Sequence, residues 1–192
     1  MKRYPLTRSQ MGVFAECMKM PGTSGYNLPY IARLPDSVDM SRLRAAWEKL
    51  ISRHSIFKNR FAFDEQGEVY QYCDRNMEIP VIYRRDSEKN VIKYIADGFM
   101  RPFDILSGEP LVRVELVETE KCKYMFSDMH HTIGDGSTMI SVILHQELPA
   151  LYEGREPDAE IIDLYHAAEI EENSIHNEEC EKAKEILCPA FC

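Results

Sequence analysis

Apolar residues recur along the chain with two different periods. A spacing of three or four residues, which brings side chains onto one face of a helix, predicts five helices. Alternation of apolar and polar residues, or a short apolar run between turn residues, predicts six strands. The helices are expected over residues 6–20, 40–53, 87–100, 139–151 and 161–187, the last with a break near Asn173. The strands are expected over residues 26–34, 56–63, 69–73, 80–84, 111–117 and 123–129.

The order of these elements indicates the fold class. Thr7 and Asp39 stand where the first two helices begin, and both residue types cap helix N-termini. The turn sequence Asp-Glu-Gln-Gly at residues 64–67 is expected to close a hairpin between the second and third strands. Because strands and helices interleave without an internal repeat, we expect an α/β (α+β) fold with a mixed β-sheet flanked by helices. A chain of 192 residues can form one domain with a real core, or one lobe of a larger protein.

Composition narrows the class of protein. Apolar residues make up 44% of the chain, which indicates a globular protein, and the net charge is −9. That charge argues against nucleic acid as a partner, since phosphates require a basic surface. No apolar run approaches the ~20 residues of a membrane span, and no apolar signal region follows the basic residues after Met1. We therefore expect no membrane contact and a cytoplasmic location. The six cysteines lack the close pairs of a zinc or redox site and are expected to be free thiols.

The strongest candidate for chemistry is the stretch Met129–Ser137, between the last strand and the fourth helix. His130 and His131 end the strand, and successive strand side chains point to opposite faces, so one can pack into the fold while the other faces a cleft. Asp135 follows between two glycines, which permit a sharp turn and the close approach of a ligand. The amides that start the next helix are unpaired donors. A base, a turn and amide donors within this short stretch fit acyl transfer.

Three other interpretations of these residues stay open. Asp135 could simply cap the helix that follows it. His131 could be a packed side chain without chemistry. A metal site formed by His130, His131 and Asp135 is disfavoured, because adjacent histidines on opposite strand faces chelate poorly, and no metal is expected.

The chain resembles the condensation domains of nonribosomal peptide synthetases, within the chloramphenicol acetyltransferase-like superfamily. His130, His131, Asp135 and Gly136 fill the fixed positions of the family signature His-His-x-x-x-Asp-Gly. Three further stretches match the family in order and spacing, over residues 4–187. These are Tyr4-Pro5-Leu6-Thr7-x-x-Gln10, Arg53-His54-x-x-Phe57-Lys58-x-Arg60-Phe61, and Arg101-Pro102-Phe103-Asp104 through Pro110-Leu111-Val112-Arg113.

This resemblance implies a fold, a reaction and partners. Family domains have two similar lobes with the active site between them, so residues 1–192 would be an N-terminal lobe whose C-terminal lobe is a missing partner. The family joins an acyl or peptidyl thioester to an aminoacyl acceptor and so forms an amide bond. Both substrates arrive on phosphopantetheine arms of partner carrier-protein domains, and no directly bound cofactor is expected.

The same resemblance assigns roles to single residues. His131 would accept the proton of the attacking amine or orient that amine. An amide near Gly136 would stabilise the oxyanion that develops on the thioester carbonyl. His130 and Asp135 would be structural, with Asp135 in an inward ion pair.

The chain departs from the family in two respects. Lys58 stands where the family has the arginine that pairs with Asp135, and lysine keeps the charge but not the bidentate geometry. Arg60 is a rival partner for that aspartate. The chain is also half as long as a family domain, so we expect it to fold without catalysing condensation. Apolar surface left exposed beside the histidine turn would favour self-association.

Other functions remain open within and outside this superfamily. An epimerisation domain shares the histidine pair, and a related acyltransferase could use a free alcohol or amine. Heterocyclisation is disfavoured, because that subclass replaces both histidines with aspartates. The alternative from another class is a non-catalytic lobe that docks carrier proteins.

Overall fold

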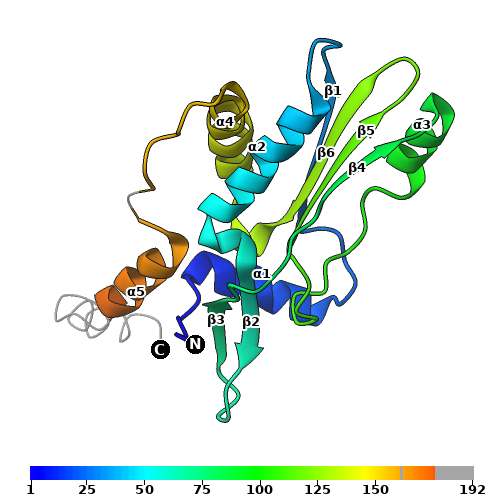
Figure 1. Cartoon of the computed structure of the whole chain (residues 1–192). Coiled ribbons are helices and arrows are strands. Elements are labelled where there is room, and N and C mark those ends of the chain that lie inside the picture. The colour runs from blue at the N-terminus through cyan, green and yellow to red at the C-terminus, as the bar shows by residue number, and fades with distance from the viewer. Residues whose placement is uncertain (161, 176–192) are drawn as a thin grey trace, which may run out of the picture.

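The fold is built on a four-stranded mixed sheet, shown in Figure 1. The computed structural model describes residues 1–160 and 162–175. The strand order is β1 (Asn27–Leu34), β6 (Lys123–His130), β5 (Val112–Glu118) and β4 (Val81–Arg85). β6 is antiparallel to both of its neighbours, whereas β4 and β5 are parallel. The predicted fold class, a mixed sheet flanked by helices, is confirmed.

Helix α2 (Met40–Arg53) covers one face of this sheet and begins and ends where the sequence predicts. Asp39 caps it, because its carboxylate accepts the backbone N–H groups of Ser41 and Arg42. Its apolar stripe buries Trp47 and Leu50 completely in the main core.

The opposite face of the sheet is covered by α3 (Glu88–Asp97), which Ser87 caps. Val91 packs there with Phe99 against Val117 and Phe126 in a second, smaller core. The helix ends at Gly98, earlier than predicted. Its neighbour Ile92 is 58% exposed, because only the Val91 side of the helix faces the sheet.

The covering helix changes the environment of β5. Its sequence predicts alternation between an apolar face and a face carrying Arg113 and Glu115, yet both faces are largely buried. Glu115 is 6% exposed and accepts a hydrogen bond from the Tyr94 hydroxyl at 2.5 Å. Arg84 lies 3.5 Å from the same carboxylate group. The polar residues that alternate along β5 therefore carry charges that are paired inside the protein.

Two predicted elements are divided in the structure. The first hairpin strand was expected from Ile56, but Ser55–Lys58 forms a 3₁₀ turn (η1) before β2 (Asn59–Phe63) pairs with β3 (Val69–Cys73). The helix after the histidine turn consists of η3 (Thr138–Glu147), wound with wider π-type turns, and α4 (Leu148–Glu153). Pro149 lacks an amide proton, so the hydrogen-bond ladder of η3 cannot continue through it.

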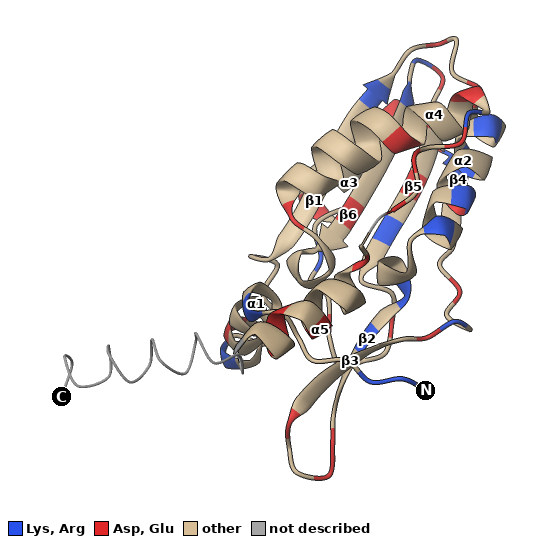
Figure 2. Ribbon diagram, turned by 90° about the vertical axis from the view of Figure 1, so that its left-hand side faces the viewer, with Lys and Arg blue, Asp and Glu red and all other residues tan. Residues whose placement is uncertain are grey.

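The N-terminal segment packs against α5 (Leu164–Ile175) on one side of the fold. Thr7 caps helix α1 (Arg8–Lys19), as predicted, and α5 lies beside the start of α1. The Tyr4 and Tyr165 rings are 4.8 Å apart, and Lys2 pairs with Glu169 at 2.7 Å. Figure 2 shows the basic N-terminal segment in blue beside this helix.

The last predicted helix can be assessed only in part. Its first residue, 161, and residues 176–192 lie outside the described part of the chain, as do three of the cysteines. The break predicted near Asn173 does not occur, since α5 continues to Ile175. Cys17, Cys73 and Cys122 are free thiols. No helix within the described ranges is both long enough and apolar enough to cross a bilayer.

Candidate active site

His131 stands at the end of the central strand and faces a cavity of about 510 Å³. His131 is the first residue of a single 3₁₀ turn, η2 (His131–Ile133). Its backbone N–H donates to the Tyr26 carbonyl at 2.8 Å. The side chain is half-buried. We call this space the His131 cavity. It is lined by Thr7, Ser9, Gln10, Val13, Ile56, His131, Thr132, Ile133, Gly134, Asp135, Thr138, Glu160, Ile162, Asp163, Leu164 and Ala167.

The neighbouring His130 lies in the protein core with 1% of its surface exposed. Burial, with a smaller effect from His131, lowers the pKa of His130 to about 4, so its imidazole is neutral at pH 7. Its Nδ1 lies 2.8 Å from Oγ1 of Thr132, and its Nε2 lies 3.5 Å from Sγ of Cys17. The two histidines therefore divide as predicted, one inward and one toward a cavity, although His131 lies in η2 and not in the strand.

The stretch from Arg101 to Arg113, identified in the sequence only by its resemblance to the family, packs against His130 in the structure. Arg113 donates hydrogen bonds to the carbonyls of Arg101 and Pro102, at 2.6 and 2.7 Å. Its guanidinium also lies 3.7 Å from the centre of the Phe103 ring. That ring packs edge-on against His130, with 5.9 Å between ring centres. The stretch thus forms a wall behind the inward histidine.

Asp135 does not make the inward ion pair that the resemblance implied. The side chain is exposed, and its Oδ1 accepts the backbone N–H of Thr138 at 2.6 Å. That hydrogen bond is the main reason why the pKa of Asp135 is lowered. The alternative interpretation, a helix N-cap, is the one that the geometry bears out, since unpaired amides of the next helix lie closer than any distant cation.

The two predicted partners of Asp135 lie elsewhere, so the predicted ion pair is wrong. Lys58 donates to the carbonyl of Arg75 at 3.3 Å. Arg60 pairs with Asp74 across the end of the hairpin, at 2.7 Å. Both cations belong to the β2–β3 region, which supplies its own acceptors.

Of the two positions that flank Asp135, space argues for a glycine only at Gly134, and there only the flexible end of the Met129 side chain stands in the way. Gly134 has an extended backbone, with φ 170° and ψ 171°, and neither glycine lies in the left-handed region. A side chain at Gly134 would come within 2.9 Å of the Met129 side chain, whereas one at Gly136 would meet nothing within 4 Å. Helical winding starts at Gly136, so its amide is among those that a helix start leaves available. Its role toward an oxyanion remains a prediction.

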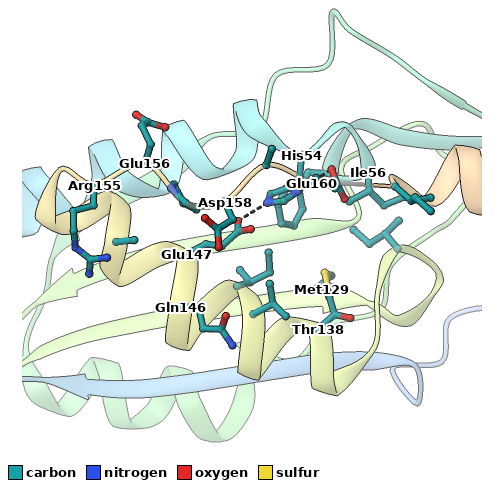
Figure 3. Close-up of a pocket in the computed structure, with 18 residues that line it drawn as sticks. His54, Ile56, Met129, Thr138, Gln146, Glu147, Arg155, Glu156, Asp158 and Glu160 are labelled. Atoms are coloured by element: carbon teal, nitrogen blue, oxygen red, sulfur yellow. Dashed lines mark hydrogen bonds and ion pairs between the residues drawn. The ribbon is translucent and has the colours of Figure 1, made fainter.

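A second cavity of about 610 Å³ adjoins the first and is shown in Figure 3. The two cavities share Ile56, Ile133, Thr138, Glu160 and Ile162. On the wall of the second cavity, Nε2 of His54 lies 2.5 Å from Oε2 of Glu147. His54 also reaches Glu160 at 3.4 Å through Nδ1. Both members of the His54–Glu147 pair are buried.

Glu147 and Asp128 lie outside the motifs, yet their positions in the sequence indicate buried polar groups. Glu147 stands four residues after Ile143 and four before Leu151, which is the spacing of the buried helix face. A carboxylate at that position indicates a buried partner. Asp128 shares its strand face with Phe126 and His130, and it is fully buried against Asn27, whose Nδ2 lies 2.6 Å away.

No group of three or more histidine, cysteine, aspartate or glutamate side chains in residues 1–160 and 162–175 is arranged to hold a metal ion. The expectation that the site uses no metal is left as a prediction.

Comparison with known proteins adds independent findings. A family model described as "Condensation domain" matches residues 1–185. The chain is 35% identical over 154 residues to gramicidin S synthase 2 of Aneurinibacillus migulanus. It is 32% identical over 155 residues to bacitracin synthase 2 of Bacillus licheniformis. Each match covers 80% of this chain, but only 3% and 6% of the two synthases.

Solved structures show the same fold. The starter condensation domain of rhizomide synthetase matches all of this chain with a TM-score of 0.81 at 15% identity. The first condensation domain of the calcium-dependent antibiotic synthetase, in complex with a substrate analogue, matches all of it with a TM-score of 0.75 at 20% identity. In both cases the chain spans 48% of the solved protein, about half of its length.

Proposed function

This chain belongs to the condensation-domain family of nonribosomal peptide synthetases, and from that premise we propose that it is the histidine-bearing N-terminal lobe of an amide-forming condensation domain. The proposed substrates are an acyl or peptidyl thioester and an aminoacyl acceptor, each on the phosphopantetheine arm of a carrier protein. The second lobe and the carrier proteins are the proposed partners.

The observation that carries this proposal is the contrast between the two histidines. His131 is half-buried beside a cavity, while His130 is buried and neutral. Only the first can meet a substrate. An imidazole that faces substrate can act as a general base.

In the proposed reaction, the acceptor amine attacks the thioester carbonyl and a C–N bond forms. The amine proton passes to Nε2 or Nδ1 of His131. As the C–S bond breaks, the departing thiolate takes up a proton. The amide at Gly136, at the start of the next helix, supports the negative charge on the carbonyl oxygen. Asp135 contributes by capping that helix start rather than by contacting substrate.

The proposal is tested by His131→Ala in the polypeptide that holds this lobe together with its second lobe. We expect amide formation between two loaded carrier proteins, followed by mass spectrometry, to fall by about 10²–10⁴-fold. His145→Ala is the matched control, because His145 is exposed on η3 and should leave the rate unchanged. Normal product formation by the His131 variant would refute the proposed role.

The lobe by itself is expected to give no product with the same carrier proteins. Only one side of the proposed channel is present, and the positioning of two reactants can contribute ~7–11 kcal/mol to lowering a barrier. Turnover by the lobe within tenfold of the two-lobe protein would contradict this view. Sedimentation of the same sample would then show whether two copies associate.

A further inference from the structure

We propose that Gln10 is a positioning residue, which acts through a paired amide with Gln71 to hold the turn that carries His131. The proposal rests on the proposed function only in so far as it concerns His131 as the reacting group. Its structural part concerns this chain alone.

The two glutamine side chains form a closed pair inside the protein. Nε2 of Gln10 donates to Oε1 of Gln71 at 2.8 Å, and Nε2 of Gln71 donates to Oε1 of Gln10 at 2.8 Å. Gln10 is 4% exposed and Gln71 is fully buried. Reciprocal bonding of this kind fixes both amide orientations, because a flip of either would place donor against donor.

The remaining hydrogen bonds of the pair go to three backbone groups in two segments, the histidine turn and the residues before α1. The second proton of Gln10 Nε2 goes to the Thr132 carbonyl at 2.8 Å. The second proton of Gln71 Nε2 goes to the Pro5 carbonyl, also at 2.8 Å. Oε1 of Gln10 additionally accepts the Thr7 backbone N–H at 3.0 Å. All four amide protons are used, so the pair joins α1, β3 and the histidine turn without an unpaired group.

The turn is consequently fixed on both sides of His131. The His131 N–H donates to the carbonyl of Tyr26, the residue just before β1. The Thr132 N–H faces Nδ1 of His130 at 3.3 Å, and the Thr132 carbonyl is held by Gln10. Within residues 1–160 and 162–175 the His131 side chain makes no hydrogen bond, so its direction is set by the backbone that carries it.

Gln10 also lines the His131 cavity. Its methylene groups can contact a bound group while its amide is committed to Gln71 and Thr132. A residue with these commitments is suited to set the geometry of the reacting imidazole, and not to transfer a proton itself.

The experiment compares two variants of the 192-residue chain with ¹³C-labelled histidine rings. Gln10→Glu removes both N–H donors, and the double variant Gln10→Met with Gln71→Met replaces the whole pair by apolar groups of similar shape. The double variant leaves neither glutamine amide unpaired, but the backbone groups of Pro5, Thr7 and Thr132 lose their side-chain partners. Gln66→Glu, at the exposed hairpin tip, is the matched control for charge. Circular dichroism establishes which variants are folded.

We expect the His131 ring signal of the folded variants to shift and broaden, and its titration midpoint to move, while the signals of His145 and His166 stay in place. The control should match the parent protein. An unchanged His131 signal in a folded double variant would overturn the proposal. If Gln10→Glu fails to fold, the double variant alone decides.

In the two-lobe protein, the same double variant should lower the rate of condensation by roughly 10- to 100-fold without changing the carrier-protein concentration needed for half-maximal rate. If that concentration rises while the maximal rate stays the same, the defect lies in binding, and the positioning role is overturned. If His131→Ala has no effect on condensation, the proposed function fails, whereas the ring measurement still tests whether Gln10 holds the turn.

Discussion

At the scale of single residues, the site depends on how each polar side chain finds its partner. His130 and His131 are adjacent, yet the first is paired inside the core and the second faces a cavity. The backbone change at the end of β6, from strand to 3₁₀ turn, separates them. His131 is thereby carried by a backbone whose neighbouring groups are hydrogen-bonded.

Asp135→Ala should lower the free energy of unfolding by about 1 kcal/mol, the usual contribution of a helix cap. Asp135→Asn should lose less, because asparagine also caps well. Urea denaturation measures both. A loss of about 3–5 kcal/mol would instead indicate a buried ion pair and would contradict the capping role.

The pH dependence of the same aspartate has a defined sign. The hydrogen bond from the Thr138 amide lowers the pKa of Asp135 in the folded state. Its stabilising effect is therefore complete above the unfolded pKa of ~3.9 and is lost as the pH falls through the lower folded value. The alanine variant should become as stable as the parent protein at the acidic end of that range.

Asp128 should show the opposite sign. Burial is the main reason why its pKa rises to about 6, so the native state holds a proton that the unfolded chain releases near ~3.9. Stability should then fall as the pH rises from about 4 to about 6, and stay level above that. Asp128→Asn should remove this slope, measured as the difference in unfolding free energy between variant and parent across pH 4–7. A difference that does not vary with pH would contradict the raised pKa.

At the scale of elements, the contact between α2 and η3 has a polar centre. His54 is the C-cap of α2 and Glu147 is the last residue of η3, and they meet at 2.5 Å. Phe57 lies edge-on to the His54 ring, with 6.0 Å between ring centres. The pair thus fixes how the helix after the histidine turn sits on α2.

His54→Leu and Glu147→Leu should each lower the free energy of unfolding by about 3 kcal/mol, because each leaves a buried polar partner. The double variant should lose less than the sum, by about 1–3 kcal/mol. Urea denaturation of the parent protein, the two single variants and the double variant completes this double-mutant cycle. Glu153→Gln, which removes only an exposed contact with Arg155, should change stability by less than about 0.5 kcal/mol. Additive single effects would show that His54 and Glu147 do not act as a pair.

At the scale of the whole molecule, one continuous core joins most elements. It includes Phe14 of α1, Phe61 of the hairpin and Leu151 of α4, together with the single tryptophan, Trp47. Trp47 is fully buried, and its ring N–H points to Sδ of Met125 at 3.3 Å. Because this core joins elements that are far apart in the sequence, we expect the protein to unfold cooperatively.

We therefore expect Trp47 fluorescence and far-ultraviolet circular dichroism to report the same urea midpoint. The emission maximum should shift to longer wavelength only in that transition. The measurement is repeated at two protein concentrations, which separates unfolding from self-association. Two distinct midpoints would mean that the hairpin and α1 unfold independently of the sheet.

Local features of this protein follow from the sequence by itself. The bounds of α2 and its Asp39 cap, the hairpin turn at residues 64–67, and the inward–outward division of His130 and His131 depend on residues a few positions apart. Helical period, capping chemistry and strand alternation act over that range, so they can be read from the printed sequence.

Partner choice was decided only by the tertiary structure. Whether Asp135 caps a helix or pairs with a cation depends on which groups the fold brings near it, and the fold placed Arg60 beside Asp74. His54 and Glu147 are 93 positions apart, and Gln10 and Thr132 are 122 apart. No local period connects such residues, because their meeting is set by the packing of α1, α2 and η3 around the sheet.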